Sequence, residues 1–141
     1  MSTANRRLLI IVNLGTPAAP TPEAVHEFLL EFLSDPSVID WPGWLLQPIL
    51  RRFVLRSRPR RFAELYRSIW TAGGSPLEGG TRKIAAGIER LAAGSFDVAW
   101  AFRYGNRSLH RTFSERVGPD TEAVVLPLFT RRTSSTTGSV F

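Results

Sequence analysis

The fold of this chain is decided by the stretch LLIIVNLGTP, residues 8–17. Its apolar run is too short for a stable solitary helix and ends at a Gly-Thr-Pro break, which predicts a strand buried on both faces. Such strands form parallel sheets, and open α/β sheets bind ligands in the crevice beyond the carboxyl ends of their strands. Gly15 allows a sharp turn at that end. Residues 13–17 are therefore the first candidate site; the alternative is a buried strand that leaves through a plain turn.

Composition limits the classes of function that remain open. The 141 residues suffice for one ordinary domain with a real core. Lys and Arg number 18 against 12 Asp and Glu, and this excess favours a phosphate, carboxylate or anionic lipid partner, or else only a solvated basic surface. The absence of Cys excludes disulfides, thiolate metal sites and a Cys nucleophile. We find no signal-peptide cleavage pattern and no run of about 18 apolar residues, the length that a transmembrane helix needs.

Helices are predicted from caps and apolar stripes. Thr21-Pro22-Glu23 opens the first helix, which Asp35-Pro36 ends. A second helix is predicted to start at Pro59 and a third to span residues 81–93, with Gly94 as its stop. A further helix is expected over residues 108–117. The side chains expected to face inward from the last two helices are Ile84, Ile88, Leu91, Leu109 and Phe113.

Two more strands complete the expected sheet. Apolar residues alternate strictly over residues 96–104, and the stretch 123–129 reads as a third, buried strand. The strand 96–104 delivers Arg103 and Tyr104 to its carboxyl end. Arg103 either holds a ligand carboxylate or pairs with a structural acid, and its place in the crevice favours the ligand. The order β, α, lid, α, α, β, α, β predicts a three-stranded parallel sheet with right-handed crossovers.

Residues 41–58 differ in kind from the rest. They combine Trp, Phe and aliphatic residues with arginines, and Pro and Gly interrupt them, so two short apolar helical pieces are expected. Such a segment suits an interface, either over an apolar ligand or on a membrane surface. The alternative is the core of a helical lid.

The remaining polar motifs bear on the type of ligand. The GGSPL loop, residues 73–77, offers backbone amides and a hydroxyl to an anionic group, although a plain turn is the alternative. His26 has no second ligand at i+4 and is read as a surface histidine, and His110 is expected to be exposed. Neither G-x-G-x-x-G nor a Walker A pattern occurs, which disfavours nucleotides. Three strand ends and an apolar lid suit a flat hydrophobic molecule that carries carboxylates.

Seven motifs in order carry a family resemblance: VNLGTP, FLSDPSVIDWP, RPRRFAELYRSIW, GGSPL, FRYGN, VVLPL and SSTTGSV. Together they resemble the amino-terminal half of bacterial ferrochelatase, which inserts ferrous iron into protoporphyrin IX to complete haem. The resemblance implies an α/β fold, a Rossmann-like parallel sheet flanked by helices, which forms the first half of a two-domain chelatase. Residues 1–141 would then be a truncated amino-terminal chelatase domain. A cytoplasmic enzyme, peripheral on the inner membrane, is the implied setting.

The resemblance also implies residue roles. Ser75 and Arg103 match positions that hold porphyrin propionates, Tyr66 lies nearby, and Leu14 matches a position that faces the macrocycle. The expected porphyrin-binding set is Leu14, Tyr66, Ser75, Arg103 and Tyr104. Residues 41–55 match the hydrophobic lip of the pocket mouth, whose expected members are Trp41, Trp44, Leu45, Leu46, Ile49 and Phe53.

The chain departs from the family in two places. The family's proton-accepting or iron-guiding His and its partner Glu lie in the carboxyl-terminal half, so no catalytic or metal residue is assigned here and this chain alone is expected to be inactive. Residues 129–132 read Phe-Thr-Arg-Arg where the family often has Tyr-Pro-Gln-Tyr. Ferrous iron and protoporphyrin IX are implied as substrates, and no cofactor is expected. Candidate partners are porphyrin, a membrane surface and a separate carboxyl-terminal half chain; nucleic acid is not expected. The alternative is a non-catalytic fragment that binds porphyrin or a membrane.

Overall fold

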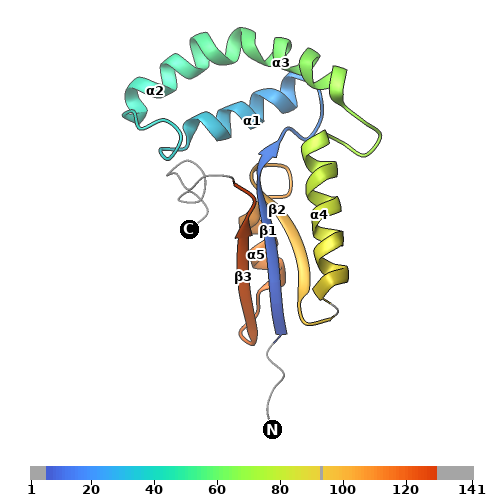
Figure 1. The fold of residues 1–141 in the computed structure, drawn as a ribbon. Helices are drawn as coiled ribbons and strands as arrows, with labels where there is room; N and C mark the ends of the chain where they lie inside the picture. The colour runs from blue at the N-terminus through green and yellow to red at the C-terminus, as the bar shows by residue number, and fades with distance from the viewer. Residues whose placement is uncertain (1–5, 93, 130–141) are drawn as a thin grey trace.

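A three-stranded parallel sheet with the order β2-β1-β3 forms the centre of the molecule, as Figure 1 shows. The computed structural model describes residues 6–92 and 94–129. In chain order the elements are β1 (Arg6–Thr16), α1 (Pro22–Ser34), α2 (Gly43–Ile49), the π-helical turn η1 (Leu50–Val54), α3 (Leu55–Ile69), α4 (Pro76–Ala92), β2 (Asp97–Gly105), α5 (Leu109–Arg116) and β3 (Thr121–Pro127). The predicted element order and parallel sheet are confirmed.

Strand β1 is central and buried on both faces, as its sequence predicts. Ile10, Ile11 and Val12 are fully buried. On one face, Ile10 and its neighbours pack with the small residues Ala99 and Ala101 of β2 and with Leu109 of α5. Removing such side chains from water stabilises the fold by about 1.5–3 kcal/mol each.

Helix α1 has the boundaries that its capping residues predict. The Thr21 side chain accepts a hydrogen bond from the backbone N–H of Ala24 at 3.3 Å, and Pro22 occupies the first turn. The helix ends at Asp35, whose Oδ1 accepts from the backbone N–H of Ser37. In Figure 1, α1 and α3 lie one above the other across the upper end of the sheet, where β1 ends.

The arm formed by α2, η1 and α3 is longer and more continuous than predicted. The prediction of two separate helical pieces and a helix start at Pro59 is wrong, because α3 begins at Leu55 and helical structure runs without a gap from Gly43. Pro59 lies inside α3 and is buried. Leu55, Pro59 and Ala63 recur every four residues as the buried stripe of α3, so tertiary packing outweighs the local preference of proline for a helix start.

Helix α4 begins five residues earlier than predicted and turns a different face inward. Ser75 caps it, since the Ser75 hydroxyl accepts from the backbone N–H of Glu78 at 3.2 Å. The buried positions are Thr81 and Ala85, whereas Ile84 is exposed and Leu91 is 86% exposed, against the prediction. The hydrogen bond from the Asn13 amide to the Thr81 hydroxyl fixes which face of α4 meets β1. Gly94 follows α4 with φ of 82°, in keeping with a helix stop.

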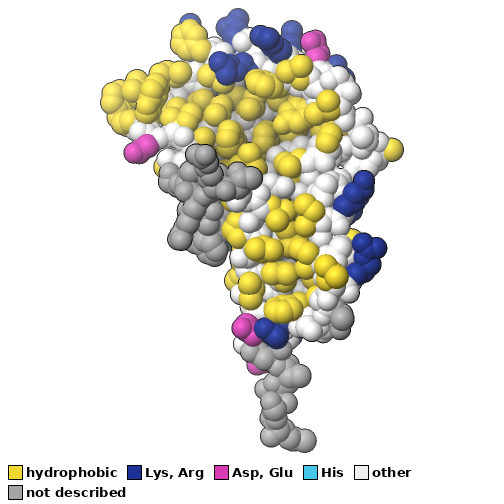
Figure 2. Space-filling model, in the orientation of Figure 1, with side chains coloured by type: hydrophobic (Ala, Val, Ile, Leu, Met, Phe, Trp, Pro, Cys, Tyr) yellow, Lys and Arg dark blue, Asp and Glu magenta, His cyan; other side chains and the backbone are white. Residues whose placement is uncertain are grey.

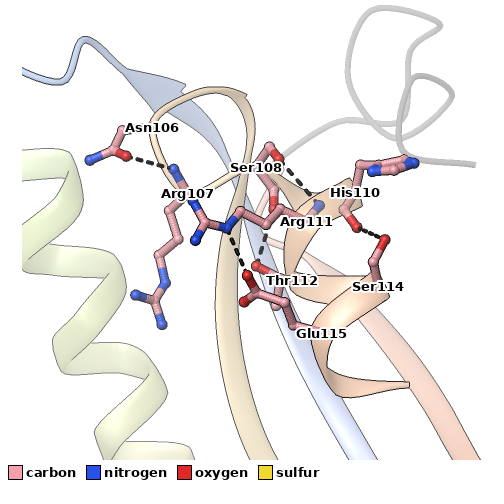
Figure 3. A network of polar contacts seen from close by, with 8 residues as sticks. All are labelled: Asn106, Arg107, Ser108, His110, Arg111, Thr112, Ser114 and Glu115. Carbon is pink, nitrogen blue, oxygen red and sulfur yellow. Dashed lines mark hydrogen bonds and ion pairs between the residues drawn. The ribbon is translucent and has the colours of Figure 1, made fainter. Parts of the chain in front are cut away.

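Helix α5 and the turn before it form the polar network drawn in Figure 3. Ser108 caps the helix by accepting from the backbone N–H of Arg111 at 3.3 Å. Thr112 is the buried residue and donates its hydroxyl to the Ser108 carbonyl. Phe113 is exposed, contrary to the inward prediction, because Thr112 occupies the buried position of this short helix. His110 is exposed, as predicted.

Strand β3 is half exposed, so the prediction of a fully buried third strand is wrong. Val124 and Leu126 are exposed, while the intervening residues are half-buried. The reason is its place at the edge of the sheet, where none of the described helices packs against it closely. Hydrophobic side chains are visible over this part of the molecule in the lower half of Figure 2. The predictions for residues 130–141, including Arg131, Arg132 and the SSTTGSV motif, lie outside the described residues.

Candidate functional site

The carboxyl ends of β1 and β2 lie side by side and bring three of the five candidate residues to one edge. Gly15 pairs with Tyr104 and Thr16 with Gly105, so Leu14 and Arg103 lie at the same edge. The approach at Gly15 is close: a Cβ there would lie 2.1 Å from the Tyr104 carbonyl oxygen, and Gly15 has φ of 134°. Only glycine fits this position without strain.

Asp35 joins this edge to the end of α1. Its Oδ2 accepts from Arg103 Nη2 at 2.6 Å and from the Tyr104 hydroxyl at 2.9 Å. The sequence left a ligand carboxylate and a structural acid as alternative partners for Arg103. The structure shows that Asp35 is such an acid and pairs with Arg103. The Asp35 and Arg103 side chains are 11% and 29% exposed, so the ion pair is largely shielded from water. A shielded, hydrogen-bonded pair of this kind holds its geometry better than a surface pair.

The surroundings of Asp35 favour its charged form. Burial by itself raises the pKa of Asp35, but the backbone N–H and hydroxyl of Ser37, the Tyr104 hydroxyl and the Arg103 charge outweigh burial. The net effect lowers the pKa of Asp35 below its ordinary value of 3.8. Asp35 is therefore a carboxylate at neutral pH.

A second acid of α1 reaches the same strand end. The backbone N–H of Gly105 donates to Glu31 Oε2 at 2.7 Å. Tyr104 is 1% exposed, and the Phe32 ring packs edge-on against it with 5.1 Å between ring centroids. The last turn of α1 and its C-cap thus hold the end of β2 through three side chains, those of Glu31, Phe32 and Asp35.

The structure places the other two candidate porphyrin contacts on α3 and α4. Ser75 is buried immediately before α4, and the amino-terminal end of α4 lies near the carboxyl end of β1 in Figure 1. Tyr66 is half-buried near the end of α3 and packs edge-on against Trp70 at 6.1 Å. Burial raises the pKa of Tyr66, so its hydroxyl stays protonated at neutral pH. The porphyrin roles of these residues stay predictions.

Three residues of this edge were not singled out by sequence reasoning. In the sequence, Glu31 and Asp35 are only parts of a helix and its end. Thr16 falls within the candidate stretch 13–17 but received no role; its buried hydroxyl has no hydrogen-bond partner among the described residues. The Asp-Pro step that ends the first helix is the sequence signal that marks Asp35. The sequence does not show, however, that this step lies close to the hydrogen-bond donors at the end of β2.

The predicted lip is largely exposed. Trp44 is 78% exposed and Phe53 is 68% exposed, and Trp41 and Leu45 are exposed as well. Leu46 departs from the prediction because it is buried with Leu50 and Leu55 against α1. Ile49 is half-buried. The arm therefore anchors itself through one apolar stripe and turns its aromatic residues outward.

An arginine row accompanies the exposed aromatic residues. Its members are exposed and none forms an ion pair with another described residue: Arg51, Arg52, Arg56, Arg58, Arg60 and Arg61. Figure 2 shows Lys and Arg side chains along the upper margin, over the arm, with hydrophobic side chains below them. No described helix combines the length and hydropathy that crossing a bilayer requires. The outer side of the arm thus combines exposed aromatic side chains with positive charge.

Metal-binding side chains do not gather in the described part of the chain. Residues 6–92 and 94–129 contain no group of three His, Cys, Asp or Glu able to hold a metal ion. His26 lines an open hollow between α1 and α3 in which acidic and basic side chains alternate: Glu23, Glu27, Arg56 and Arg60.

Comparison of the sequence with known proteins identifies its family. The ferrochelatase family model matches residues 7–141. The ferrochelatase of Methylococcus capsulatus is 48% identical over 141 residues, which cover 99% of this chain and 42% of the relative. Ferrochelatase 1 of Shewanella oneidensis is 42% identical over 138 residues, covering 94% of this chain and 41% of the relative.

The relatives are longer than this chain. The ferrochelatase of Edwardsiella ictaluri is 41% identical over 139 residues, covering 98% of this chain and 43% of its own length. The chain thus spans about two fifths of the curated relatives that it matches. The family match extends over almost the entire sequence and includes the strand ends that Asp35 joins. This chain belongs to the ferrochelatase family.

Proposed function

We propose that this chain supplies part of the porphyrin site of a ferrochelatase, which inserts ferrous iron into protoporphyrin IX in haem biosynthesis. The observation that carries the proposal is the match to the ferrochelatase family over residues 7–141. The shared sheet edge of Leu14 and Arg103 supports it, because this edge is where open α/β sheets bind ligands.

The chemistry of the candidate residues suits a porphyrin dicarboxylate. A guanidinium has five N–H donors, so the bond from Arg103 to Asp35 is compatible with a second carboxylate partner. The Ser75 hydroxyl accepts a bond from the backbone of Glu78 and can still donate its own proton. Leu14 and the apolar lip offer surface to the macrocycle, which favours burial against hydrocarbon and aromatic groups.

Iron insertion also needs a group to accept the two pyrrole protons. We assign no such base in this chain, and we propose that the 141 residues alone are inactive and bind no resident cofactor. A separate polypeptide that provides the remaining part of the chelatase is the proposed partner. Iron and protoporphyrin are substrates of the completed enzyme.

The arm is proposed to rest on the surface of the inner membrane from the cytoplasmic side. Exposed Trp44 and Phe53 suit the boundary between headgroups and acyl chains, and the arginine row suits anionic headgroups. This surface also favours the second candidate function, a non-catalytic fragment that binds porphyrin or a membrane.

The first test is a porphyrin titration of the purified chain. Protoporphyrin is added while its Soret absorbance and the Trp fluorescence are followed, for the unchanged chain, Arg103→Ala and Arg90→Ala. Arg90 is an exposed residue in the last turn of α4, so its variant is a matched control for lost positive charge. We expect saturable binding that only Arg103→Ala weakens. Absence of saturable binding, or equal effects of both variants, would contradict the assigned site.

The second test separates the enzyme from the non-catalytic fragment. The chain is mixed with the part of the Methylococcus capsulatus relative that lies outside the aligned 42%, and ferrous iron insertion is measured. Recovered insertion, dependent on both polypeptides, supports the enzymatic function. Porphyrin binding without recovered insertion favours the non-catalytic fragment.

A further inference from the structure

The Asp35 carboxylate connects the end of α1 and the residues just after it to the end of β2. Oδ1 accepts from the backbone N–H of Ser37 at 2.7 Å. Oδ2 accepts from Arg103 Nη2 at 2.6 Å and from the Tyr104 hydroxyl at 2.9 Å. Both oxygens are thus engaged, and the carboxylate has a fixed orientation at the end of α1.

Contacts other than those with Asp35 also hold this end of β2. Tyr104 is packed against Phe32 and is almost fully buried, and the Arg103 guanidinium lies 4.7 Å from the centre of the Tyr104 ring. Glu31 holds the next residue, Gly105, through its backbone N–H. An arginine side chain has large rotamer freedom in isolation, and these contacts restrict that freedom.

We propose that Asp35 is a positioning residue for carboxylate recognition: it holds the Arg103 guanidinium at the carboxyl edge of the sheet, where Arg103 meets a carboxylate of the ligand. This inference rests on the proposed function, because it requires Arg103 to contact a porphyrin carboxylate. Asp35 itself touches no ligand in this arrangement. It acts by fixing the place and orientation of the donor that does.

A negative charge beside Arg103 has two opposing effects on a ligand anion. The charge repels the anion and competes for N–H donors, whereas the charge-assisted bond removes the entropy cost of ordering the arginine on binding. The geometry favours ordering, because Asp35 is itself held by Ser37 and Tyr104 and accepts a short hydrogen bond from Arg103. Positioning therefore predicts weaker ligand binding when the Asp35 charge is removed.

The test is a double-mutant cycle read with two ligands. Binding of protoporphyrin and of its dimethyl ester is measured in one detergent buffer for the unchanged chain, Asp35→Asn, Arg103→Ala and the double variant. Asp40→Asn is the matched control, since Asp40 is an exposed acid and the variant loses the same charge. We expect Asp35→Asn to weaken diacid binding about three- to tenfold and the double variant to bind no worse than Arg103→Ala.

The outcomes distinguish a positioning role of Asp35 from a purely structural role and from competition with the ligand. A loss that is equal for the diester, or that persists in the Arg103→Ala background, would show a merely structural role and overturn the inference. Tighter diacid binding by Asp35→Asn would show that Asp35 competes with the ligand, which also overturns it. If Arg103→Ala leaves diacid binding unchanged, the proposed function fails instead, because Arg103 is then no carboxylate contact.

Discussion

The sheet edge at Asp35 and the arm above it differ in whether their charged side chains have ion-pair partners. At the edge, Arg103 is paired with Asp35 in a largely shielded ion pair, and a nearby backbone donor is satisfied by Glu31. On the arm, the arginines of residues 51–61 are exposed and make no ion pair with other described residues. The charges at the edge are thus paired within the chain, whereas the arginines of the arm have no ion-pair partner among the described residues.

This difference separates the parts of the molecule that hold the fold from the part that offers a surface. Substitutions at the edge remove paired, shielded groups and are expected to cost stability. Substitutions on the outer side of the arm remove exposed groups and are expected to change binding with little effect on stability. Four variants test the separation, from the largest expected effect to the smallest.

Gly15→Ala is expected to have the largest effect on folding. The new Cβ would lie 2.1 Å from the Tyr104 carbonyl oxygen, on a residue whose φ is 134°, so β1 and β2 must separate at their carboxyl ends. We expect a loss of more than about 3 kcal/mol in the free energy of unfolding, measured by urea denaturation with circular dichroism. Gly43→Ala, on the arm, has no atom within 4 Å of the new Cβ and is the control. Similar losses for both variants would contradict the comparison.

Asp35→Asn is expected to destabilise the fold by about 1–3 kcal/mol at pH 7, because it removes charge-assisted hydrogen bonds. Burial opposes the charged form, but the partners of Asp35 lower its pKa below 3.8 in the folded chain. The stabilising contribution of Asp35 is therefore present above its unfolded pKa and is lost as the pH falls through the lower folded pKa. Urea denaturation from pH 7 to pH 3 should show the stability difference between the two chains shrinking below about pH 4. A difference that is constant over this range would refute the role given to the Asp35 charge.

Trp44→Ser combined with Phe53→Ser tests the arm. Both side chains are mostly exposed, so the melting temperature is expected to change little. Binding to vesicles that contain anionic phosphatidylglycerol, measured by cosedimentation, is expected to weaken about tenfold, because two apolar anchors are lost. Leu91→Ser removes an exposed apolar side chain of α4 and should leave vesicle binding unchanged. Equal weakening by Leu91→Ser would show that the arm is not the membrane surface.

Glu122→Gln should have the smallest effect. Arg7 Nε lies 3.5 Å from Glu122 Oε2, and both side chains are about half exposed, in contrast with the shielded pair at Asp35. We expect a change below about 0.5 kcal/mol that vanishes at high salt. A loss as large as that of Asp35→Asn would remove the distinction between surface and shielded ion pairs in this chain.

Local sequence signals predicted the elements whose determinants are local. The strand over residues 8–17 follows from its apolar run, and α1 follows from the Thr21 cap and Asp35. The strand 96–104 follows from its alternation. In each case the residues that decide the structure are neighbours in the chain, so a sequence pattern is sufficient.

The predictions that were wrong or left alternatives open concern determinants that are distant in sequence. The partner of Arg103 is 68 residues away, and no local pattern links it to Asp35. The inward face of α4 is set by the bond between Asn13 and Thr81, and apolar spacing alone selected Ile84 and Leu91 instead. Proline preference placed a helix start at Pro59, where packing against α1 decides the geometry. Tertiary contacts therefore determine the details of the site edge.

The pairing of β1 has a consequence for folding during synthesis on the ribosome. β1 leaves the ribosome before both of its partner strands, which β1 pairs with from Asp97 and Thr121 onward. At usual synthesis rates of about 5–20 residues per second, the apolar β1 segment waits roughly 5–20 seconds before β2 exists. During that time its backbone groups and its Leu-Ile-Ile-Val side chains have no native strand to pair with. We therefore expect the β1 segment of a nascent chain to need chaperone cover until the second strand is made.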